Sequence, residues 1–359
     1  MRPLEFGWYL PTHGDTTAYG LPGAEIPGSV ELCDRVVAAA EKAGFEYLLI
    51  PVGSVCWEAW ISGAFMAARS SRIKPLIAAR PGYINPVLMA KMISTFDQMS
   101  GGRICINLIA GQNESEVEAE GVRFAKEQRY ALMEEEVSIL KALWTASGPV
   151  HFAGKFHAIT GAHVRPRPLQ KPHPKFYLGG GSRQAWEISA KHSDVHLFWG
   201  DLPDRIAQNI AEIRELARAH GRENEIGFGM RLQIICREEE SEAWQAADQL
   251  VRHAGERLKQ ERNTLYNNSI ANLRVQQLAR EHGDLLLPHL WTGITRVRPG
   301  AGIAVVGNPA QCADQLQQFI DAGCHSFCLS GYLHDEEAER FGRLVRPILA
   351  ENNRGRLAA

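Results

Sequence analysis

Short apolar runs alternate with amphipathic helical stretches along almost the whole chain. The strand-like runs occupy residues 4–10, 47–51, 73–79, 104–110, 175–179, 195–199, 226–237 and 326–329. The helical stretches that follow them occupy residues 30–44, 58–70, 87–99, 126–144, 182–192, 203–220, 241–253 and 336–349. Alternation of this kind predicts parallel strands, because neighbouring parallel strands need a helical crossover between them.

Eight strand–helix units in 359 residues favour an α/β fold of the (β/α)₈ TIM-barrel type, with residues 1–359 forming one domain. A further strand-like run at 303–306 and a helix at 309–322 lie outside the eightfold count. The alternative is an open doubly wound sheet. Its dinucleotide fingerprint GxGxxG is missing, since the phrases GGGSRQ (179–184) and GFGMRL (227–232) lack the third glycine.

Three segments interrupt the repeat, at about residues 111–125, 151–174 and 255–299. Long excursions in a barrel usually lie over the carboxyl ends of the strands, where sites are built, so we expect insertions over that face. The third segment is predicted to be a mobile lid, with a helical hairpin of no special role as the alternative. Arg296 and Arg298 end it beside glycines, which suits anion capture or a solvated basic loop.

The composition gives no support for several classes of binding partner. The 39 Lys and Arg residues and 41 Asp and Glu residues leave a formal net charge of −2, so nothing favours nucleic acid or an anionic membrane. No run reaches the ~20 apolar residues that span a bilayer, and the first residues lack a signal-peptide pattern, so a cytoplasmic location is expected. The seven cysteines contain no CxxC pair, and we expect neither a disulfide framework nor a metal site.

The clearest ligand-type signal is the triplet Gly179, Gly180 and Gly181, which lies between a strand and a helix that begins near Ser182. Backbone N–H groups at such a junction attract a phosphate, and the positive end of the helix dipole adds to the attraction. Ser182 adds a hydroxyl and Arg183 a charge. A tight turn with a serine helix cap explains the same residues without a ligand.

Other strand ends carry side chains that can bind ligands or move protons. His13 follows the first strand, Trp199 ends the sixth, and Cys56 lies at a strand–helix junction where a thiolate can be stabilised. Tyr332 and His334 are two residues apart after the last strand, so in an extended turn they point the same way. Each has a structural alternative, such as a core tryptophan or a turn before an acidic helix start.

Phrases spread over residues 5–350 resemble the flavin-dependent alkanesulfonate monooxygenases of the bacterial-luciferase-like group, in the same order and with similar spacing. They are FGWYLPTHGD (6–15), LLIPVGSVCWEAW (48–60), IAARPG (77–82), STFDQMSGGRICINLIAG (94–111), RY (129–130), PKFYLGGGS (174–182), LFWGD (197–201), FGMRLQIICR (228–237), EAWQAAD (242–248), LWTGITRVRPGAGIAVVG (290–307) and LSGYLHDEEA (329–338). The resemblance is weakest across residues 255–289.

This resemblance implies a (β/α)₈ barrel that uses reduced FMN delivered by a separate NAD(P)H-dependent flavin reductase, with O₂ as co-substrate. The reaction it implies cleaves the C–S bond of an organosulfonate and gives an aldehyde and sulfite. It also implies transient contact with the reductase and a homo-oligomer, either a dimer or a tetramer.

The resemblance also assigns roles to single residues. Those matching the flavin and phosphate contacts, with their neighbours, are Ala79, Asn107, Ala110, Tyr130, Gly180, Gly181, Ser182 and Arg183. Those matching the active-site set are His13, Trp199, Arg231, Arg298, Tyr332 and His334, together with Cys56, which corresponds to the family's cysteine near the flavin, and Gln233, which occupies an active-site position with a different residue.

Three places depart from the family pattern, and one of them is the segment from Val52 to Val55 before Cys56. Gln233 stands where the alkanesulfonate enzymes have histidine, and an amide has no proton to exchange near neutral pH. Gly181 replaces a second serine of the phosphate loop. Three alternatives therefore stay open: a different organosulfur or other small substrate, a hydride-transferring deazaflavin enzyme, and a catalytically silent flavin-binding relative.

Overall fold

The computed structural model describes residues 2–111, 114–255, 269–298 and 300–357. Eight parallel strands form a closed barrel, in the order β10-β9-β6-β5-β4-β1-β15-β11 with β11 pairing back to β10. They are β1 (Glu5–Tyr9), β4 (Tyr47–Ile50), β5 (Lys74–Ala79), β6 (Cys105–Leu108), β9 (Phe176–Gly179), β10 (Val195–Trp199), β11 (Gly227–Cys236) and β15 (Ser326–Ser330). The predicted TIM barrel is confirmed, and every predicted barrel strand is present.

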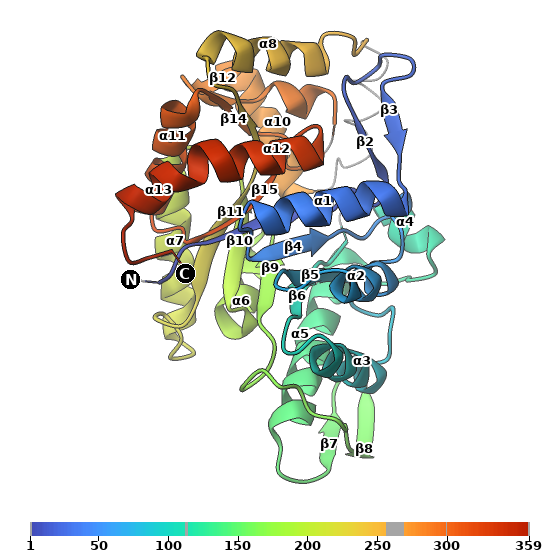
Figure 1. Cartoon of the computed structure of the whole chain (residues 1–359). Helices are drawn as coiled ribbons and strands as arrows, with labels where there is room; N and C mark the ends of the chain where they lie inside the picture. The colour runs from blue at the N-terminus through green and yellow to red at the C-terminus, as the bar shows by residue number, and fades with distance from the viewer. Residues whose placement is uncertain (1, 112–113, 256–268, 299, 358–359) are drawn as a thin grey trace.

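Helices surround the barrel in Figure 1. They are α1 (Val30–Lys42), α2 (Ala59–Ala68), α3 (Pro86–Met99), α5 (Lys126–Thr145), α6 (Arg183–His192), α7 (Pro203–Arg218), α8 (Glu240–Val251), α11 (Pro309–Asp321), α12 (His334–Arg340), the π-helical η2 (Phe341–Val345) and α13 (Arg346–Asn352). In α1, the Ser29 side chain accepts a hydrogen bond from the Leu32 N–H, and the buried residues Leu32, Val36 and Ala40 form one apolar stripe.

The long strand β11 belongs to two sheets in turn. Its residues Gly229 to Gln233 pair with β15, and its last four residues pair with β14 (Ala304–Gly307). Two short antiparallel strands, β13 (Leu290–Trp291) and β12 (Leu285–Leu287), continue the sheet beyond β14. The strand predicted at 303–306 is therefore an extension outside the barrel.

Two excursions lie at the carboxyl ends of the strands. The first contains α4 (Glu114–Ala119). The described part of the second contains α10 (Ile270–His282) and the 3₁₀ turn η1 (Gly293–Arg296), whereas residues 256–268 and 299 of the predicted lid lie outside the described residues. A small hairpin, β2 (Gly14–Thr16) and β3 (Glu25–Pro27), follows the first barrel strand.

The segment 151–174 differs from the expectation that it covers the carboxyl ends of the strands. It folds as a hairpin of β7 (Val150–Ala153) and β8 (Ala158–Ala162) on the connection that leads from α5 into the start of β9. The carboxylate of Glu135 in α5 accepts hydrogen bonds from the N–H groups of Lys155 at 2.8 Å and Phe156 at 3.0 Å. The hairpin therefore packs along α5 and contributes no residue to the cavity described below (Figure 1).

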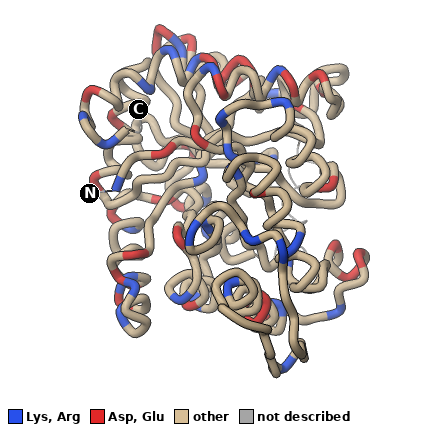
Figure 2. Tube along the Cα trace, turned by 60° about the horizontal axis from the view of Figure 1, so that its bottom comes forward, with Lys and Arg blue, Asp and Glu red and all other residues tan. Residues whose placement is uncertain are grey.

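Basic and acidic residues are interspersed along the chain in Figure 2, without a block of one sign. Within the described ranges, no helix combines the length and the apolar character that crossing a bilayer requires.

Candidate active site

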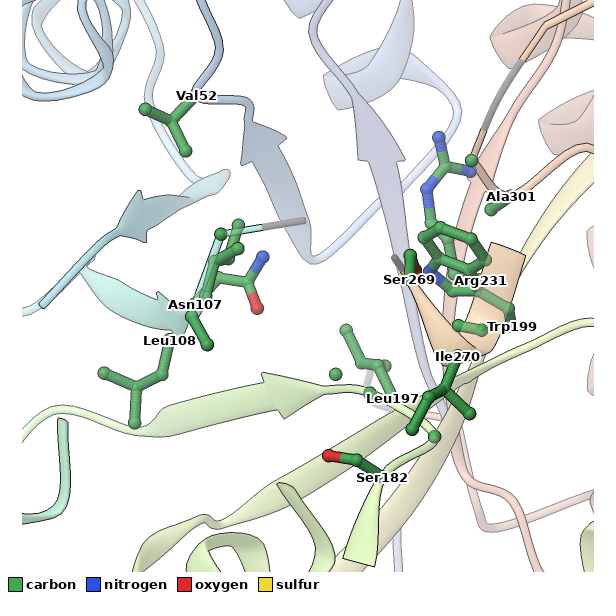
Figure 3. Close-up of a pocket in the computed structure, with 18 of the residues that line it drawn as sticks. Val52, Asn107, Leu108, Ser182, Leu197, Trp199, Arg231, Ser269, Ile270 and Ala301 are labelled. Carbon is green, nitrogen blue, oxygen red and sulfur yellow. The ribbon is translucent and has the colours of Figure 1, made fainter. Parts of the chain in front are cut away.

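A cavity of about 260 Å³ opens at the carboxyl ends of the barrel strands. Figure 3 shows Asn107 and Leu108 on one side of it, with Trp199 and Arg231 together on the opposite side. Its lining comes from Tyr9, Leu49, Val52, Arg80, Asn107 to Gly111, Glu116, Lys126, Tyr130, Gly179 to Ser182, Leu197, Trp199, Arg231, Ser269 to Ala271, Arg298, Gly300 and Ala301. Distant parts of the chain therefore meet at the end of the barrel where TIM-barrel enzymes place their chemistry.

The glycine triplet forms a cradle at the start of α6. Gly180 has φ +149°, and a Cβ there would lie 2.9 Å from the Cβ of Ala185, so a side chain does not fit. The Ser182 hydroxyl accepts a hydrogen bond from the Ala185 N–H at 3.2 Å and donates to the Tyr130 hydroxyl at 3.3 Å. Backbone N–H groups, two hydroxyls and a helix N-terminus thus converge, which fits the phosphate of a flavin mononucleotide.

A second helix N-terminus faces this cradle. The first residues of α10, Ile270 and Ala271, line the cavity together with Ser269, whose hydroxyl accepts a hydrogen bond from the Asn272 N–H at 3.2 Å. A Cβ on Gly181 would lie 3.4 Å from the Cγ2 of Ile270. Sequence reasoning missed this wall, although a serine directly before an amphipathic helix is the usual cap signal.

Two arginines lie in the same cavity. The Nη1 of Arg231 donates to the Ser330 hydroxyl at 2.9 Å, and its guanidinium carbon lies 5.1 Å from the centre of the Tyr9 ring. The Nη1 of Arg298 donates to the Tyr332 hydroxyl at 3.0 Å. Among the described residues, neither guanidinium has a carboxylate within 4.0 Å, although Arg231 is only 7% exposed. A buried cation such as Arg231 needs an anion, and the half-buried Arg298 lines the same cavity, so the cavity is suited to a negatively charged ligand.

The third arginine of the lining, Arg80, is neutralised by its neighbours. It donates to Glu116 at 2.7 Å and to Glu120 at 2.6 Å. These pairs attach α4 and the residue that follows it to the end of β5. Arg80 therefore holds the 111–125 insertion beside the cavity, and its charge is already balanced there.

The structure brings nine of the sixteen predicted site residues into the cavity lining. They are Asn107, Ala110, Tyr130, Gly180, Gly181, Ser182, Trp199, Arg231 and Arg298. The other seven lie outside the lining, and their positions follow.

Gln233 is completely buried behind Arg231. Its Oε1 accepts a hydrogen bond from the Ser330 hydroxyl at 2.7 Å, and its Nε2 donates to the carbonyl of Ala301 at 3.0 Å. Since Ser330 also accepts from Arg231, the amide connects that guanidinium to the 301–303 segment. Gln233 is thus placed to position Arg231 through the Ser330 hydroxyl, and it does not line the cavity itself.

Tyr332 and His334 point to different partners. Tyr332 accepts from Arg298 and from the hydroxyl of Tyr19 at 2.6 Å, so it positions the arginine from behind. The Nδ1 of His334 lies 2.9 Å from Oδ2 of Asp15, and that carboxylate also accepts the His334 backbone N–H at 2.7 Å. Although burial opposes it, His334 keeps the pKa of Asp15 below its ordinary value.

The remaining four predicted residues lie around the rim or beneath it. His13 is exposed, with its ring centre 6.2 Å from that of Tyr9. Arg183 pairs with Glu187 on the outer surface of α6. Ala79 is buried in β5, and Cys56 is partly buried.

Burial changes the expectation for Cys56. It raises the pKa of the Cys56 thiol, because a thiolate loses hydration there, and this outweighs the hydrogen bond from Thr12. This environment favours the neutral thiol over the thiolate that the strand–helix junction could have stabilised. Within the described ranges, no three His, Cys, Asp or Glu side chains cluster as metal ligands.

Comparison with known proteins extends these observations. The profile of the luciferase-like monooxygenase family matches residues 4–326. A riboflavin lyase structure superposes with a TM-score of 0.81 at 17% identity, covering 99% of this chain and 93% of that one. The EDTA monooxygenase from Chelativorans sp. BNC1 superposes with a TM-score of 0.74 at 18% identity, covering 98% of this chain and 94% of that one. DmoA from Hyphomicrobium sulfonivorans superposes with a TM-score of 0.73 at 19% identity, covering 100% of this chain and 90% of that one.

At these identities the three structures establish a shared fold. The family match covers most of the chain and, together with the shared fold, supports the class of luciferase-like flavin-dependent monooxygenases. The chain belongs to the luciferase-like monooxygenase family.

Proposed function

We propose that the chain is the monooxygenase component of a two-component system that cleaves the C–S bond of an organosulfonate. The observation that carries the proposal is the pair Arg231 and Arg298, which share one cavity and have no carboxylate partner among the described residues. A sulfonate is permanently anionic and offers three oxygens in a compact group. Guanidinium forks bind such oxoanions with paired hydrogen bonds.

The residues present fit reduced FMN as the cofactor. Gly180, Gly181, Ser182 and Tyr130 would hold its phosphate, and Asn107 faces the interior of the cavity (Figure 3). Reduced flavin supplies the two electrons that let O₂ insert one oxygen atom into the substrate. The overall change converts sulfonate, O₂ and reduced FMN into aldehyde, sulfite, water, a proton and oxidised FMN, so atoms and electrons balance.

The protein's own groups bind and orient the substrate. Arg231 and Arg298 hold the sulfonate, and Trp199 forms an aromatic wall beside Arg231 (Figure 3). Tyr332 fixes Arg298 through its 3.0 Å hydrogen bond. The proposal includes a transient encounter with a separate NAD(P)H-dependent flavin reductase, a cytoplasmic location, and a homo-oligomeric assembly.

The test is sulfite release from a panel of sulfonates, with FMN, NADH and a general flavin reductase. The proposal predicts sulfite and aldehyde in equal amounts from at least one sulfonate, dependent on O₂. Activity that needs a reduced deazaflavin and ignores O₂ would support hydride transfer instead. No turnover of any sulfonate by a chain that binds reduced FMN would contradict the proposed substrate class.

A further inference from the structure

The peptide unit between Gly180 and Gly181 is the least constrained part of the glycine cradle. Gly179, before it, is held by the pairing of β9 with β10, and Ser182, after it, is held by its cap on α6. Neither Gly180 nor Gly181 has a Cβ, so this peptide plane rotates more freely than one flanked by larger residues. The bond is trans, so its carbonyl and its N–H point in opposite directions. Rotation therefore decides which of the two groups faces the active-site cavity.

Trp186 fixes the orientation of this peptide. Its indole N–H donates to the carbonyl oxygen of Gly180 at 3.1 Å. Its own backbone N–H donates to the carbonyl of Ser182, also at 3.1 Å, in the first turn of α6. The side chain is 9% exposed and packs within the hydrophobic core. A rigid ring anchored on a helix therefore holds the Gly180 carbonyl in one direction.

The position of Trp186 shows which way the carbonyl is turned. A second cavity, of about 470 Å³, lies behind the cradle, and Gly180 and Gly181 line both cavities. Trp186 lines the second cavity and is absent from the described lining of the active-site cavity. The Gly180 carbonyl points toward Trp186, so the Gly181 N–H points the other way, into the active-site cavity. No acceptor among the described residues receives that N–H.

An N–H group aimed into the cavity suits a phosphate. Phosphate oxygens accept charge-assisted hydrogen bonds from backbone N–H groups near helix N-termini. The opposite orientation of the same peptide would turn the Gly180 carbonyl toward the ligand, and the partial negative charge of that oxygen would repel a phosphate. The hydrogen bond from Trp186 therefore favours the orientation that attracts the anion.

We infer that Trp186 is a positioning residue for the flavin phosphate. It holds the Gly180 carbonyl away from the ligand, so that the Gly181 N–H donates to a phosphate oxygen. Trp186 acts through this peptide, because its side chain lies behind the cradle. The inference rests on the proposed function, since it takes the cradle to be the flavin phosphate site.

Calorimetric titration of the full chain with reduced FMN and with reduced riboflavin, under anaerobic conditions, tests this. Trp186→Phe keeps an aromatic ring and removes the indole N–H. It should weaken FMN about tenfold, the usual effect of losing a charge-assisted hydrogen bond, and leave riboflavin within about twofold, because riboflavin lacks the phosphate. Trp144→Phe is the matched control, because the buried indole of Trp144 donates to a carbonyl away from the cradle, that of Ala90, at 3.2 Å. It should leave the affinity for both flavins unchanged.

Trp186→Met is a second variant without the indole N–H, and the unfolding midpoint of each variant is measured to establish that it is folded. Trp186→Met should repeat the loss of FMN affinity with riboflavin unchanged. Parental FMN affinity in the folded Trp186 variants, or equal losses for FMN and riboflavin, would overturn the inference and leave the proposed function intact. Equal affinity of the parent chain for the two flavins would show that the cradle binds no phosphate, and would refute the cofactor assignment of the proposed function together with this inference.

Discussion

The buried amide of Gln233 gives a sharp test of how the site is held together. Replacing it with leucine keeps a similar volume and removes two hydrogen bonds, one from Ser330 at 2.7 Å and one to Ala301 at 3.0 Å. The backbone bond from the Gln233 N–H to Ile303 at 2.9 Å remains, so the strand register is kept. The change therefore isolates the side-chain connection between Arg231 and the 301–303 segment.

The size of the change in the free energy of unfolding depends on which polar groups are left unpaired. Each hydrogen bond contributes about 0.5–1.5 kcal/mol net, and an orphaned buried carbonyl costs about 1–3 kcal/mol. The Ser330 oxygen still accepts from Arg231, but its own proton loses the acceptor that Gln233 provided, so the penalty falls on the Ser330 O–H and on the Ala301 carbonyl. We expect Gln233→Leu to lower the free energy of unfolding by about 2–4 kcal/mol.

Denaturant unfolding followed by circular dichroism measures this, and Gln315→Leu is the matched control. Gln315 in α11 is also buried, at 3% exposure, but its Nε2 has no partner among the described residues. Removing an amide whose buried Nε2 is unpaired should cost much less stability than removing the paired amide of Gln233. Equal destabilisation by the two substitutions would show that the Gln233 network contributes nothing special, and the reasoning would be refuted.

Three further outcomes follow from the geometry. Burial raises the pKa of Glu136, a residue of α5, from 4.5 to about 7. The folded chain is therefore stabilised while this carboxyl is protonated, and the stabilisation is lost as the pH rises through 7. Denaturant unfolding should show that Glu136→Gln is more stable than the parent at pH 8 and similar to it at pH 4. Tyr130→Phe should weaken FMN about tenfold and leave riboflavin unchanged, because riboflavin lacks the phosphate; equal losses in a binding titration would contradict this. Reduced FMN should bind more tightly than oxidised FMN, and a yellow cofactor that survives dialysis would count against a borrowed flavin.

The barrel was predictable because hydrophobic periodicity carries most of the information about alternating strands and helices. Each of the eight strands contains a buried apolar run, and capping residues such as Ser29 and Ser182 mark helix starts. The position of the glycine triplet before α6 was predictable, because glycines followed by a capping serine mark a strand–helix junction, whereas the same residues are also explained by a tight turn. The 151–174 hairpin was misplaced, because sequence does not show which end of the barrel a connection reaches.

The surroundings of Arg231, Gln233, Tyr332 and His334 were harder to predict, because they depend on contacts between segments that are distant in the sequence. Arg231 and Gln233 are two residues apart, so strand alternation puts them on one side, yet the 301–303 segment crosses over Gln233 and covers it. Likewise, α12 begins at His334, so the extended turn assumed for Tyr332 and His334 ends there. The contact of the 301–303 segment with Gln233 is not visible in local sequence, whereas the helix start at His334 agrees with the acidic residues that follow it.

The most direct test of the account is the charge requirement of Arg298. An ammonium group does not reproduce a guanidinium fork, so Arg298→Lys should lower kcat/KM for a sulfonate about ten- to a hundredfold, the equivalent of about 1.5–3 kcal/mol. Arg218→Lys, on the surface of α7, is the control and should match the parent chain. The account predicts this loss with flavin affinity unchanged. Parental kcat/KM in both Arg298→Lys and Arg298→Ala would contradict it.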